Sequence, residues 1–325
     1  HLKEKKRLKL IHNLFKITKY HVVKKVVFVV FYPLDCCKKK HDLYITFCFR
    51  LTYNEDMIKW CDVVVPCGGD GTFLLARHFM SDFFYSKPVI GFNSAPHKSV
   101  GRLCLPTWCS NDVKGALHAL KEVSVVKFNE KKLTTWLSEI LFDLWTDKLY
   151  CRQVFIGESV TSRVSLLRLQ IDNGKWTHTK SSGLCVTTGT GSTSWHFSIN
   201  CLRTHSVLEL MKILKEDFDV NLDTNLEKAR EVAERYNQKL MFAPDCDQLA
   251  YSVREYITFE EWPAPRGLRV RDRAAAVQVK SHCTDAGLVV DGSVSFPFND
   301  GTEAQLEIHP EDSLMTVQMD DALPY

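Results

Sequence analysis

Two glycine-rich segments, about 120 residues apart, carry the residue types best suited to chemistry. In the first, an apolar run ends at Cys67 and is followed by two glycines, the acid Asp70, a third glycine and a helix expected to begin near Thr72. Glycines let a polyphosphate approach the backbone closely, and a helix N-terminus adds N–H donors and a favourable dipole. An aspartate inside an anion site can accept a proton from an attacking hydroxyl, hold Mg²⁺ or do both, as phosphoryl transfer requires. The alternative is an ordinary strand-to-helix turn capped by Asp70, and the short motif alone does not decide between the two.

The second segment runs from Ser181 to Trp195 and is dense in glycine and hydroxyl residues. A strand predicted over Leu184–Thr187 leads into it. Backbone and side-chain donors in such a loop suit phosphates and ribose edges, and Trp195 offers a ring that can pack on a base. Taken alone, the segment is better explained as a flexible Ser/Thr/Gly turn.

The elements around the first segment alternate between strands and helices. Short β-branched runs bounded by Pro or Gly predict buried strands at Val26–Tyr32, Asp62–Val65 and Pro88–Phe92. Helices are predicted over Thr72–Met80 and from Ser110, as N-cap, with Val113, Leu117 and Leu120 on one face. This alternation predicts a parallel α/β sheet in an N-terminal domain over residues 1–125.

The second half of the chain reads as mostly antiparallel β-structure. Two-residue turn signals follow three apolar runs, at Asn173-Gly174, Asp291-Gly292 and Asp300-Gly301, and each predicts a hairpin. A β-rich domain is therefore expected over residues 126–305. Helices predicted at Val207–Asp217 and Leu226–Leu240 form a surface insertion at about 203–242, and residues 129–150 show no period that can be assigned. The segment of about 306–325 is expected to pack back on the first domain.

The composition excludes several classes of protein. A length of 325 residues, with 45% hydrophobic and 25% charged residues, is typical of two globular domains. Forty-two Lys and Arg against 39 Asp and Glu leave a net charge of +3, too balanced for a chain that tracks nucleic acid. Twelve cysteines without a CxxC pair fit reduced thiols, and no histidine pattern predicts a metal site. The longest apolar run near the N-terminus is too short to cross a membrane.

Several segments together resemble the NAD kinase family, and specifically its mitochondrial type. They occur in the family's order from about residue 48 to the C-terminus: Gly68–Thr72, Val89–Asn93, Gly101–Pro106, Val154–Ser159, Ser181–Trp195, Val289–Gly292 and Phe298–Gly301. The resemblance implies an N-terminal Rossmann-like α/β domain, a β-sandwich-like C-terminal domain and an active site between them. It implies transfer of the ATP γ-phosphoryl group to the adenosine-ribose 2′-hydroxyl of NAD, giving NADP. Mg²⁺ would enter with the nucleotide phosphates rather than on protein ligands.

The resemblance also assigns roles to residues. Asp70 matches the catalytic aspartate that orients and deprotonates the hydroxyl. The residues expected to bind NAD or the nucleotide are Gly68, Gly69, Gly71, Thr72, Asn93, Arg152, Gln153, Thr190, Gly191, Thr193, Ser194, Trp195 and Ser198. Asp291-Gly292 is interpreted as a type I′ turn that supports the site. Family members form dimers or larger homo-oligomers, and a mitochondrial matrix location is expected, with the cytoplasm as the alternative. The basic stretch before residue 25 fits the tail of a transit peptide or a solvated helix face equally well.

One departure from the family's pattern concerns the dinucleotide site. Where the family has an Asn-acidic pair immediately before Val154, this chain has Arg152-Gln153, so that a neutral amide replaces an acidic hydroxyl acceptor and a cation enters the pocket. A catalytically weak nucleotide-binding homologue is therefore an alternative. A lipid kinase of the diacylglycerol or sphingosine type, which shares the first glycine motif, is another, although the loop that ends in Trp195 argues against it.

Overall fold

The computed structural model describes residues 25–30, 37–40, 43–49, 52–78, 87–97, 101–112, 115–116, 134–137, 140–144, 147–244, 246–257, 268–292, 294–308 and 314–317. The chain divides into two compact units. Unit 1 comprises His1–Leu137 and Ser313–Tyr325, and unit 2 comprises Ser138–Asp312. The boundary predicted after residue 125 lies outside the described residues, so the predicted domain limits stay a prediction.

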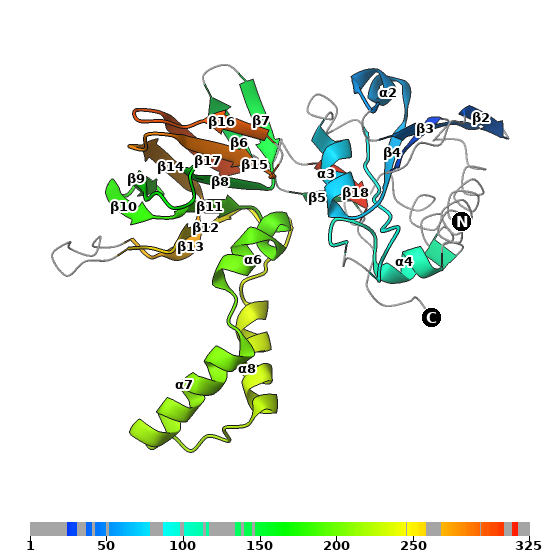
Figure 1. Ribbon diagram of the computed structural model, residues 1–325. Helices are drawn as coiled ribbons and strands as arrows, with labels where there is room; N and C mark the ends of the chain where they lie inside the picture. The colour runs from blue at the N-terminus through cyan, green and yellow to red at the C-terminus, as the bar shows by residue number, and fades with distance from the viewer. Residues whose placement is uncertain are drawn as a thin grey trace. The chain divides into compact units, whose positions relative to one another are not determined.

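Unit 1 contains a four-stranded sheet in the order β2-β3-β1-β4 (Figure 1). Its strands are β1 (Lys25–Val30), β2 (Cys37–Lys40), β3 (Leu43–Phe49) and β4 (Val63–Cys67). β1 pairs in parallel with β3 and with β4, whereas β2 is antiparallel to β3. The parallel pairing predicted for this region is therefore present. The C-terminal strand β18 (Leu314–Val317) pairs with β5 (Thr134–Leu137) in the same unit.

The run Pro88–Phe92, predicted as a strand, lies beside β4 but makes isolated parallel bridges instead of a continuous ladder. Pro66, in the middle of β4, has no N–H to donate to this run, and the ladder is interrupted there. Beyond the gap, the Phe92 N–H donates to the Pro66 carbonyl at 2.9 Å and the Gly68 N–H donates to the Phe92 carbonyl at 3.0 Å. These bonds hold the start of the glycine turn next to the residue that precedes Asn93.

Three short helices are described in unit 1: α2 (Glu55–Trp60), α3 (Asp70–His78) and α4 (Thr107–Asn111). The prediction that Ser110 caps a helix is wrong, because α4 begins directly after Pro106 and contains Ser110. The next helical turn is capped by Asp112, whose Oδ1 accepts from the Gly115 N–H at 3.1 Å. A carboxylate caps a helical N–H as well as a hydroxyl does, and the sequence analysis did not identify Asp112. Leu117, in the predicted continuation, lies outside the described residues.

Unit 2 is built from two six-stranded antiparallel sheets (Figure 1). One sheet has the order β10-β9-β14-β17-β6-β7, and the other has the order β13-β12-β11-β8-β15-β16. The strands are β6 (Ile140–Leu144), β7 (Asp147–Cys151), β8 (Gln153–Glu158), β9 (Ser165–Ile171), β10 (Thr177–Ser181), β11 (Gly183–Thr187), β12 (Leu249–Arg254), β13 (Arg271–Ala274), β14 (Ala276–Ser281), β15 (Ala286–Val290), β16 (Val294–Pro297) and β17 (Glu303–Ile308). The unassigned stretch 129–150 thus contains β5, β6 and most of β7.

A single apolar core joins the two sheets of unit 2. Alternate residues of each strand point inward, as the period of two requires, so that Ile156 and Leu184 from one sheet share a buried cluster with Leu169 and Val279 from the other. The predicted antiparallel β-structure is confirmed, with the two sheets packed as a sandwich. This rigid core supports the loops at the ends of β8 and β11.

The hairpin predictions are partly right. Asp291-Gly292 lies in the connection between β15 and β16, with both residues at positive φ, 47° and 71°, and the Asn173-Gly174 region joins β9 to β10. The pairing of Val290 with Val294 leaves three residues in the first connection, one more than in the predicted type I′ turn. The hairpin predicted at Asp300-Gly301 is wrong. β16 and β17 belong to different sheets, and the chain crosses between them after Phe298, which is buried in the shared core.

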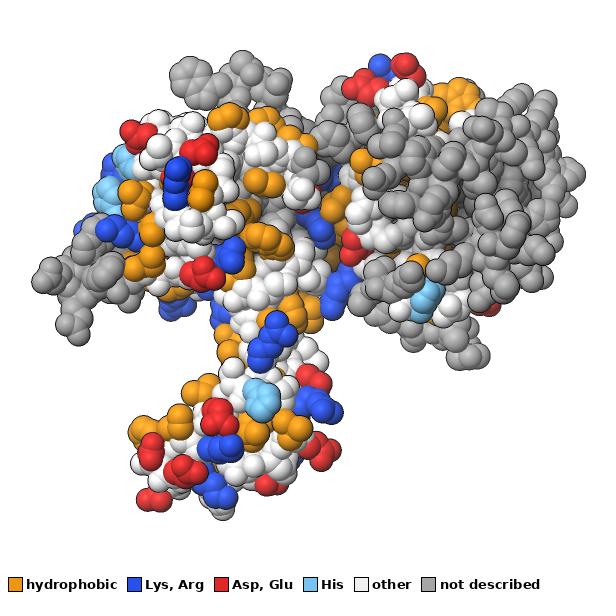
Figure 2. All heavy atoms as spheres, in the orientation of Figure 1, with side chains coloured by type: hydrophobic (Ala, Val, Ile, Leu, Met, Phe, Trp, Pro, Cys, Tyr) orange, Lys and Arg blue, Asp and Glu red, His pale blue; other side chains and the backbone are white. Residues whose placement is uncertain are grey.

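The two helices predicted in this region are present as α7 (Thr204–Asp217) and α8 (Leu226–Gln238), which form a hairpin projecting from the sheets of unit 2 (Figure 1). The hairpin has its own small core of Val207, Met211, Ala229 and Ala233. Figure 2 shows hydrophobic and charged side chains intermixed over its surface. At its base, the Asn237 carboxamide accepts from the Leu202 N–H at 2.8 Å and donates to the Leu202 carbonyl at 3.0 Å.

The composition led to expectations about the cysteines and about membrane-spanning segments, and the described residues bear on both. The described cysteines with placed side chains, from Cys48 to Cys283, are all free thiols, as predicted for reduced cysteines. Within the described part of the chain, no helix combines the length and apolar character that a membrane span needs.

Candidate functional site

The first glycine segment forms a strand-to-helix connection in unit 1. β4 ends at Cys67, Gly68 and Gly69 form the turn, and Asp70 is the first residue of α3, so the helix begins two residues earlier than the predicted start near Thr72. The Thr72 N–H donates back to the Gly69 carbonyl at 2.9 Å. The N–H groups of Gly69, Asp70 and Gly71 have no acceptor among the described residues, because the first turn of a helix leaves its amides unpaired. Three successive donors at a helix N-terminus favour an anion.

The Asp70 side chain is held by a distant backbone group. Its Oδ1 accepts from the N–H of Leu103 at 2.9 Å. Leu103 follows Gly101, which has a φ of +63°, and a Cβ at Gly101 would lie 2.4 Å from the Asn93 side-chain nitrogen. Asn93 is buried, and its Oδ1 accepts from the Ala95 N–H at 3.0 Å. The structure therefore brings Asp70 together with the segment that contains Asn93, as two neighbouring parts of unit 1.

The thiol of Cys104 is also next to the glycine turn, with its Sγ 3.7 Å from the Gly68 carbonyl oxygen. Burial raises the pKa of this thiol, and the negative charge of Asp70 and the neighbouring Cys67 raise it further. The thiol therefore stays protonated and adds no second negative charge next to Asp70.

The glycines of this segment differ in whether the fold has room for a side chain at their position. A Cβ at Gly68 would lie 2.1 Å from the Thr72 hydroxyl oxygen, so Gly68 is needed for the turn to pack. A Cβ at Gly71 would have no heavy atom within 4 Å, and its φ is not in the left-handed region. Folding therefore does not require a glycine at position 71.

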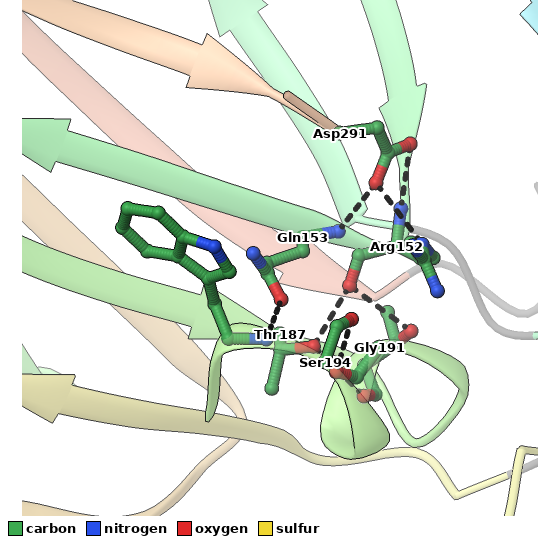
Figure 3. A network of polar contacts seen from close by, with 8 residues as sticks. Arg152, Gln153, Thr187, Gly191, Ser194 and Asp291 are labelled. Atoms are coloured by element: carbon green, nitrogen blue, oxygen red, sulfur yellow. Dashed lines mark hydrogen bonds and ion pairs between the residues drawn. The ribbon is translucent and has the colours of Figure 1, made fainter. Parts of the chain in front are cut away.

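The second set of candidate residues meets at one end of β8 and β11 in unit 2 (Figure 3). The Arg152 carbonyl accepts from the Thr187 hydroxyl at 3.0 Å and from the Thr188 N–H at 2.9 Å. Asp291 lies on the other side of the same strand end. Its carboxylate accepts from the backbone N–H groups of Gln153 at 3.2 Å and Arg152 at 3.4 Å, and it pairs with the Arg152 Nε at 3.6 Å.

The loop after β11 is ordered by its neighbours and does not form a flexible turn. It continues as a short 3₁₀ helix, η3 (Thr190–Thr193), and then as α6 (Trp195–Asn200). A Cβ at Gly191 would lie 2.1 Å from the Thr187 hydroxyl oxygen, and the Ser194 hydroxyl donates to the Gly191 carbonyl at 3.1 Å. The Thr190 hydroxyl is buried and has no hydrogen-bond partner among the described residues. The loop is thus packed closely against the end of β8.

The ring of Trp195 is 47% exposed and packs edge-on against Phe155, with ring centroids 4.8 Å apart. The Arg254 guanidinium lies 5.7 Å from the ring centroid. The Trp195 backbone N–H donates to the Gln153 Oε1 at 3.2 Å, and Ser198 is exposed one turn further along α6. An exposed ring that is fixed on two sides offers a platform for a planar base.

Sequence reasoning missed His196, which follows Trp195 and is buried. Its Nδ1 is hydrogen-bonded to the Ser252 hydroxyl at 3.0 Å, and the Asn200 side chain donates to that hydroxyl at 2.8 Å. Burial lowers the pKa of His196 to about 4, the positive charges of Arg271 and Arg273 add to the effect, and a hydrogen bond with the backbone of Leu240 acts in the opposite direction. No local pattern marks such a residue, because its partners are distant in the sequence.

No cluster of three or more His, Cys, Asp or Glu side chains able to hold a metal ion occurs among the described residues. The donors that the two sites present are backbone amides, hydroxyls, a carboxamide and a guanidinium. Such groups suit phosphate and ribose oxygens better than a bare cation.

The chain is similar to known proteins along most of its length. It is 33% identical to NAD kinase 2, mitochondrial, from Homo sapiens over 306 residues, which covers 83% of this chain and 68% of that protein. It is 34% identical to NAD kinase 2, mitochondrial, from Rattus norvegicus over 303 residues, covering 82% and 70% of the two chains. The crystal structure of an NAD kinase from Archaeoglobus fulgidus in complex with ATP shares the fold, with a TM-score of 0.56, 16% identity and coverage of 92% of this chain and 94% of that one. No family model matches the chain.

Proposed function

This chain belongs to the NAD kinase family and is an ATP-dependent NAD kinase, and we propose that Asp70 is the residue that activates the hydroxyl it phosphorylates. The reaction transfers the γ-phosphoryl group of ATP to the adenosine-ribose 2′-hydroxyl of NAD. In the proposed mechanism, the 2′-oxygen attacks the γ-phosphorus as its proton passes to the Asp70 carboxylate. The bond between the γ-phosphorus and the bridging oxygen breaks, and ADP leaves with the electron pair.

The observation that carries this proposal is the fixed orientation of Asp70. A carboxylate can act as a base only if one oxygen is aimed at the hydroxyl, and here Oδ1 is engaged by the Leu103 N–H while Oδ2 has no partner among the described residues. The unpaired amides of Gly69, Asp70 and Gly71 would stabilise phosphate oxygens near the same carboxylate. Mg²⁺ bound to the nucleotide phosphates would neutralise the charge that develops on them.

Unit 2 supplies the proposed adenosine site. Thr193, Ser194 and Ser198 offer hydroxyls, and the exposed Trp195 ring offers a surface for the base. The unpaired Thr190 hydroxyl and the closely packed Gly191 are assigned to the phosphate side of the ligand. The observation that supports this assignment is the 3₁₀ turn η3, which contains both residues. It holds the donors in place before a ligand arrives and so reduces the entropy lost on binding.

The same relatives support finer proposals. The parallel sheet of unit 1 would be a Rossmann-like sheet, the enzyme would act in the mitochondrial matrix, and it would assemble as a homodimer or a larger homo-oligomer. The relatives do not favour a lipid kinase or a binding protein without turnover.

The test is formation of NADP by the purified full chain from NAD, ATP and Mg²⁺. A panel of diacylglycerol and sphingosine acceptors serves as the comparison. Phosphorylation of NAD that disappears in Asp70→Asn is the expected result. A folded wild-type chain that binds NAD but forms no NADP would contradict the catalytic proposal, and repair of positions 152 and 153 to Asn and Glu would show whether those two residues are responsible.

A further inference from the structure

Phe155 lies on the face of β8 that points away from the core of unit 2. Its neighbours Val154 and Ile156 are fully buried in the cluster between the two sheets, whereas Phe155 alternates with them and is only partly buried. Burial in that core therefore does not explain an aromatic side chain at this position. On the outer face of the sheet, the Phe155 ring packs edge-on against Trp195, with ring centroids 4.8 Å apart.

Two glycines leave the space that the Phe155 ring occupies. Gly157 follows on the same face of β8, and a Cβ there would lie 3.1 Å from Phe155 Cε1. Gly183 begins the neighbouring strand β11 at a φ of +144°, and a Cβ there would lie 2.5 Å from Phe155 Cζ. The ring therefore fills space that side chains at these two positions would take, and the backbone of two strands confines it to the surface of the sheet.

Trp195 needs a support of this kind, because it is the first residue of α6 and 47% of it is exposed. Its backbone N–H is held by the Gln153 Oε1 at 3.2 Å, but this bond fixes the main chain and leaves the χ angles of the ring free. The Arg254 side chain, 5.7 Å from the ring centroid, is 37% exposed and pairs with the exposed Glu255, and exposed charges contribute little. Phe155, which the sheet confines, is the stronger of these two ring contacts.

From this geometry we infer that Phe155 is a positioning residue for the dinucleotide, which holds the Trp195 ring in the orientation that receives the adenine base. The inference rests on the proposed function, because it takes Trp195 as the surface for that base. A ring that is already oriented loses less conformational entropy when the ligand binds, so Phe155 lowers the concentration of NAD that the enzyme needs. Because Phe155 acts through Trp195, it changes the binding of NAD and leaves the transfer step unchanged.

The test is a double-mutant cycle in the purified full chain, with Phe155→Leu, Trp195→Leu and the two combined. Each variant is measured by steady-state kinetics in NAD and in ATP and by calorimetric titration with NAD. Phe155→Leu keeps an apolar side chain but removes the ring, so KM and Kd for NAD should rise about three- to tenfold, the range that a pair of aromatic rings contributes. The values of kcat and of KM for ATP should stay within about twofold. In the Trp195→Leu background, Phe155→Leu should have no further effect, because the ring that it positions is absent.

Two further variants separate this role from general damage. Phe218→Leu makes the same change at a position that is 67% exposed, at the end of α7, and is the matched control that should keep the wild-type KM for NAD. Gly157→Ala tests the support while both rings are present. Its Cβ would press on the Phe155 ring and on the Ser182 carbonyl, each 3.1 Å away, and the ring moves more easily than the backbone. KM for NAD should therefore rise in this variant as well.

Three outcomes overturn the inference. The first is a folded Phe155→Leu variant with the wild-type KM and Kd for NAD. The second is an effect of Phe155→Leu that is equally large in the Trp195→Leu background, or that changes kcat and KM for ATP as much as KM for NAD. The third, which applies even if Phe155→Leu fails to fold, is a folded Gly157→Ala variant that binds NAD as the wild type does.

Failure of the proposed function gives a different result. The wild type would then form no NADP, and the calorimetric cycle with NAD would still decide the role of Phe155. A folded wild-type chain that binds no NAD would overturn both proposals.

Discussion

The Oδ1 atom of Asp70 accepts a hydrogen bond from the backbone N–H of Leu103 at 2.9 Å, so the residue that opens α3 is oriented by a segment 33 residues further along the chain. The donor is a backbone group, and its position depends on the left-handed conformation of Gly101 and on the buried side chain of Asn93. Residues in both segments therefore help to fix the orientation of the Asp70 carboxylate.

Asp70→Asn is expected to lower kcat by about 10²-fold to 10⁴-fold, the usual contribution of a general base, and to leave the fold intact. The carboxamide oxygen of Asn can still accept from Leu103, so the substitution removes the base and keeps the hydrogen bond. Asp70→Ala removes both and should also lower the free energy of unfolding by about 1 kcal/mol. Steady-state kinetics and urea unfolding of both variants check this. Equal stability losses in the two variants would contradict the importance of the Leu103 hydrogen bond.

The Gly71→Ala substitution distinguishes a role of Gly71 in folding from a role in letting phosphate oxygens approach the backbone. Because a Cβ at position 71 meets no heavy atom within 4 Å, the free energy of unfolding should stay the same or rise slightly. If phosphate oxygens approach this backbone as proposed, the methyl group obstructs them, and kcat/KM should fall about tenfold or more, as a misplaced reactant typically causes. Normal kcat/KM in a stable Gly71→Ala variant would remove Gly71 from the site.

Gly101→Ala is expected to destabilise the protein more than Gly292→Ala. Both glycines have positive φ, 63° and 71°, so each alanine incurs the left-handed backbone cost of about 1–2 kcal/mol. At Gly101 the new Cβ also collides with Asn93, whereas at Gly292 it has open space. The midpoints of urea unfolding for the two variants give the comparison. Equal losses would mean that the Asn93 side chain moves aside without cost.

The stability of the protein is expected to fall in mild acid because of His196. Its pKa in the folded protein is lowered to about 4 by burial, whereas in the unfolded chain it lies near the ordinary value of 6.5. The unfolded state therefore binds the proton first, and the stabilisation is complete above pH 6.5 and is lost as the pH falls toward 4. Between pH 7 and pH 5 this linkage amounts to about 2 kcal/mol.

The measurement is urea unfolding of the wild type and His196→Gln at both pH values. His196→Gln lowers stability at pH 7 because it breaks the bond to Ser252, but its loss between pH 7 and pH 5 should be smaller than that of the wild type. His205→Gln, at an exposed position on α7, is the matched control and should behave like the wild type. An identical pH dependence in His196→Gln would assign the acid sensitivity to other groups.

Chelation of divalent metal is expected to stop turnover and to leave the melting temperature of the nucleotide-free protein unchanged. The reason is that the metal would arrive with the nucleotide phosphates, and the described residues contain no cluster of metal-binding side chains. Differential scanning fluorimetry with and without EDTA, together with the activity assay, checks both parts. A drop in melting temperature on chelation would point to a structural ion.

The glycine segments could be recognised from the sequence because a strand, a glycine turn and a helix start are close together in the chain. Their partners could not. Leu103 contributes a backbone N–H, which any residue supplies, and Asp291 reads as a turn residue although its carboxylate binds Arg152, 139 residues away. The spacing of apolar runs was enough to predict which region is parallel and which is antiparallel. It was not enough to predict the residues at which individual strands and helices begin and end.

The errors have local physical reasons. Ser110 and Asp112 are both of a residue type that caps helices, but Ser110 lies inside α4, and Asp112 is the one whose side chain accepts from a following backbone N–H. An Asp-Gly pair favours a turn whether the flanking strands pair or change sheets, so in the sequence Asp300-Gly301 resembles Asp291-Gly292, which does connect paired strands.

The two hydrogen bonds between the Asn237 side chain and the Leu202 backbone have a consequence for where the chain can be lengthened. The Asn237 carboxamide links the two ends of the α7–α8 hairpin through hydrogen bonds with the N–H and the carbonyl of Leu202, neither of which involves the tip of the hairpin. The entropy of closing a loop rises only slowly with its length. The tip of the hairpin, between Phe218 and Asn225, is therefore the place where the chain can be extended or joined to a reporter domain while η3 and α6 keep their positions.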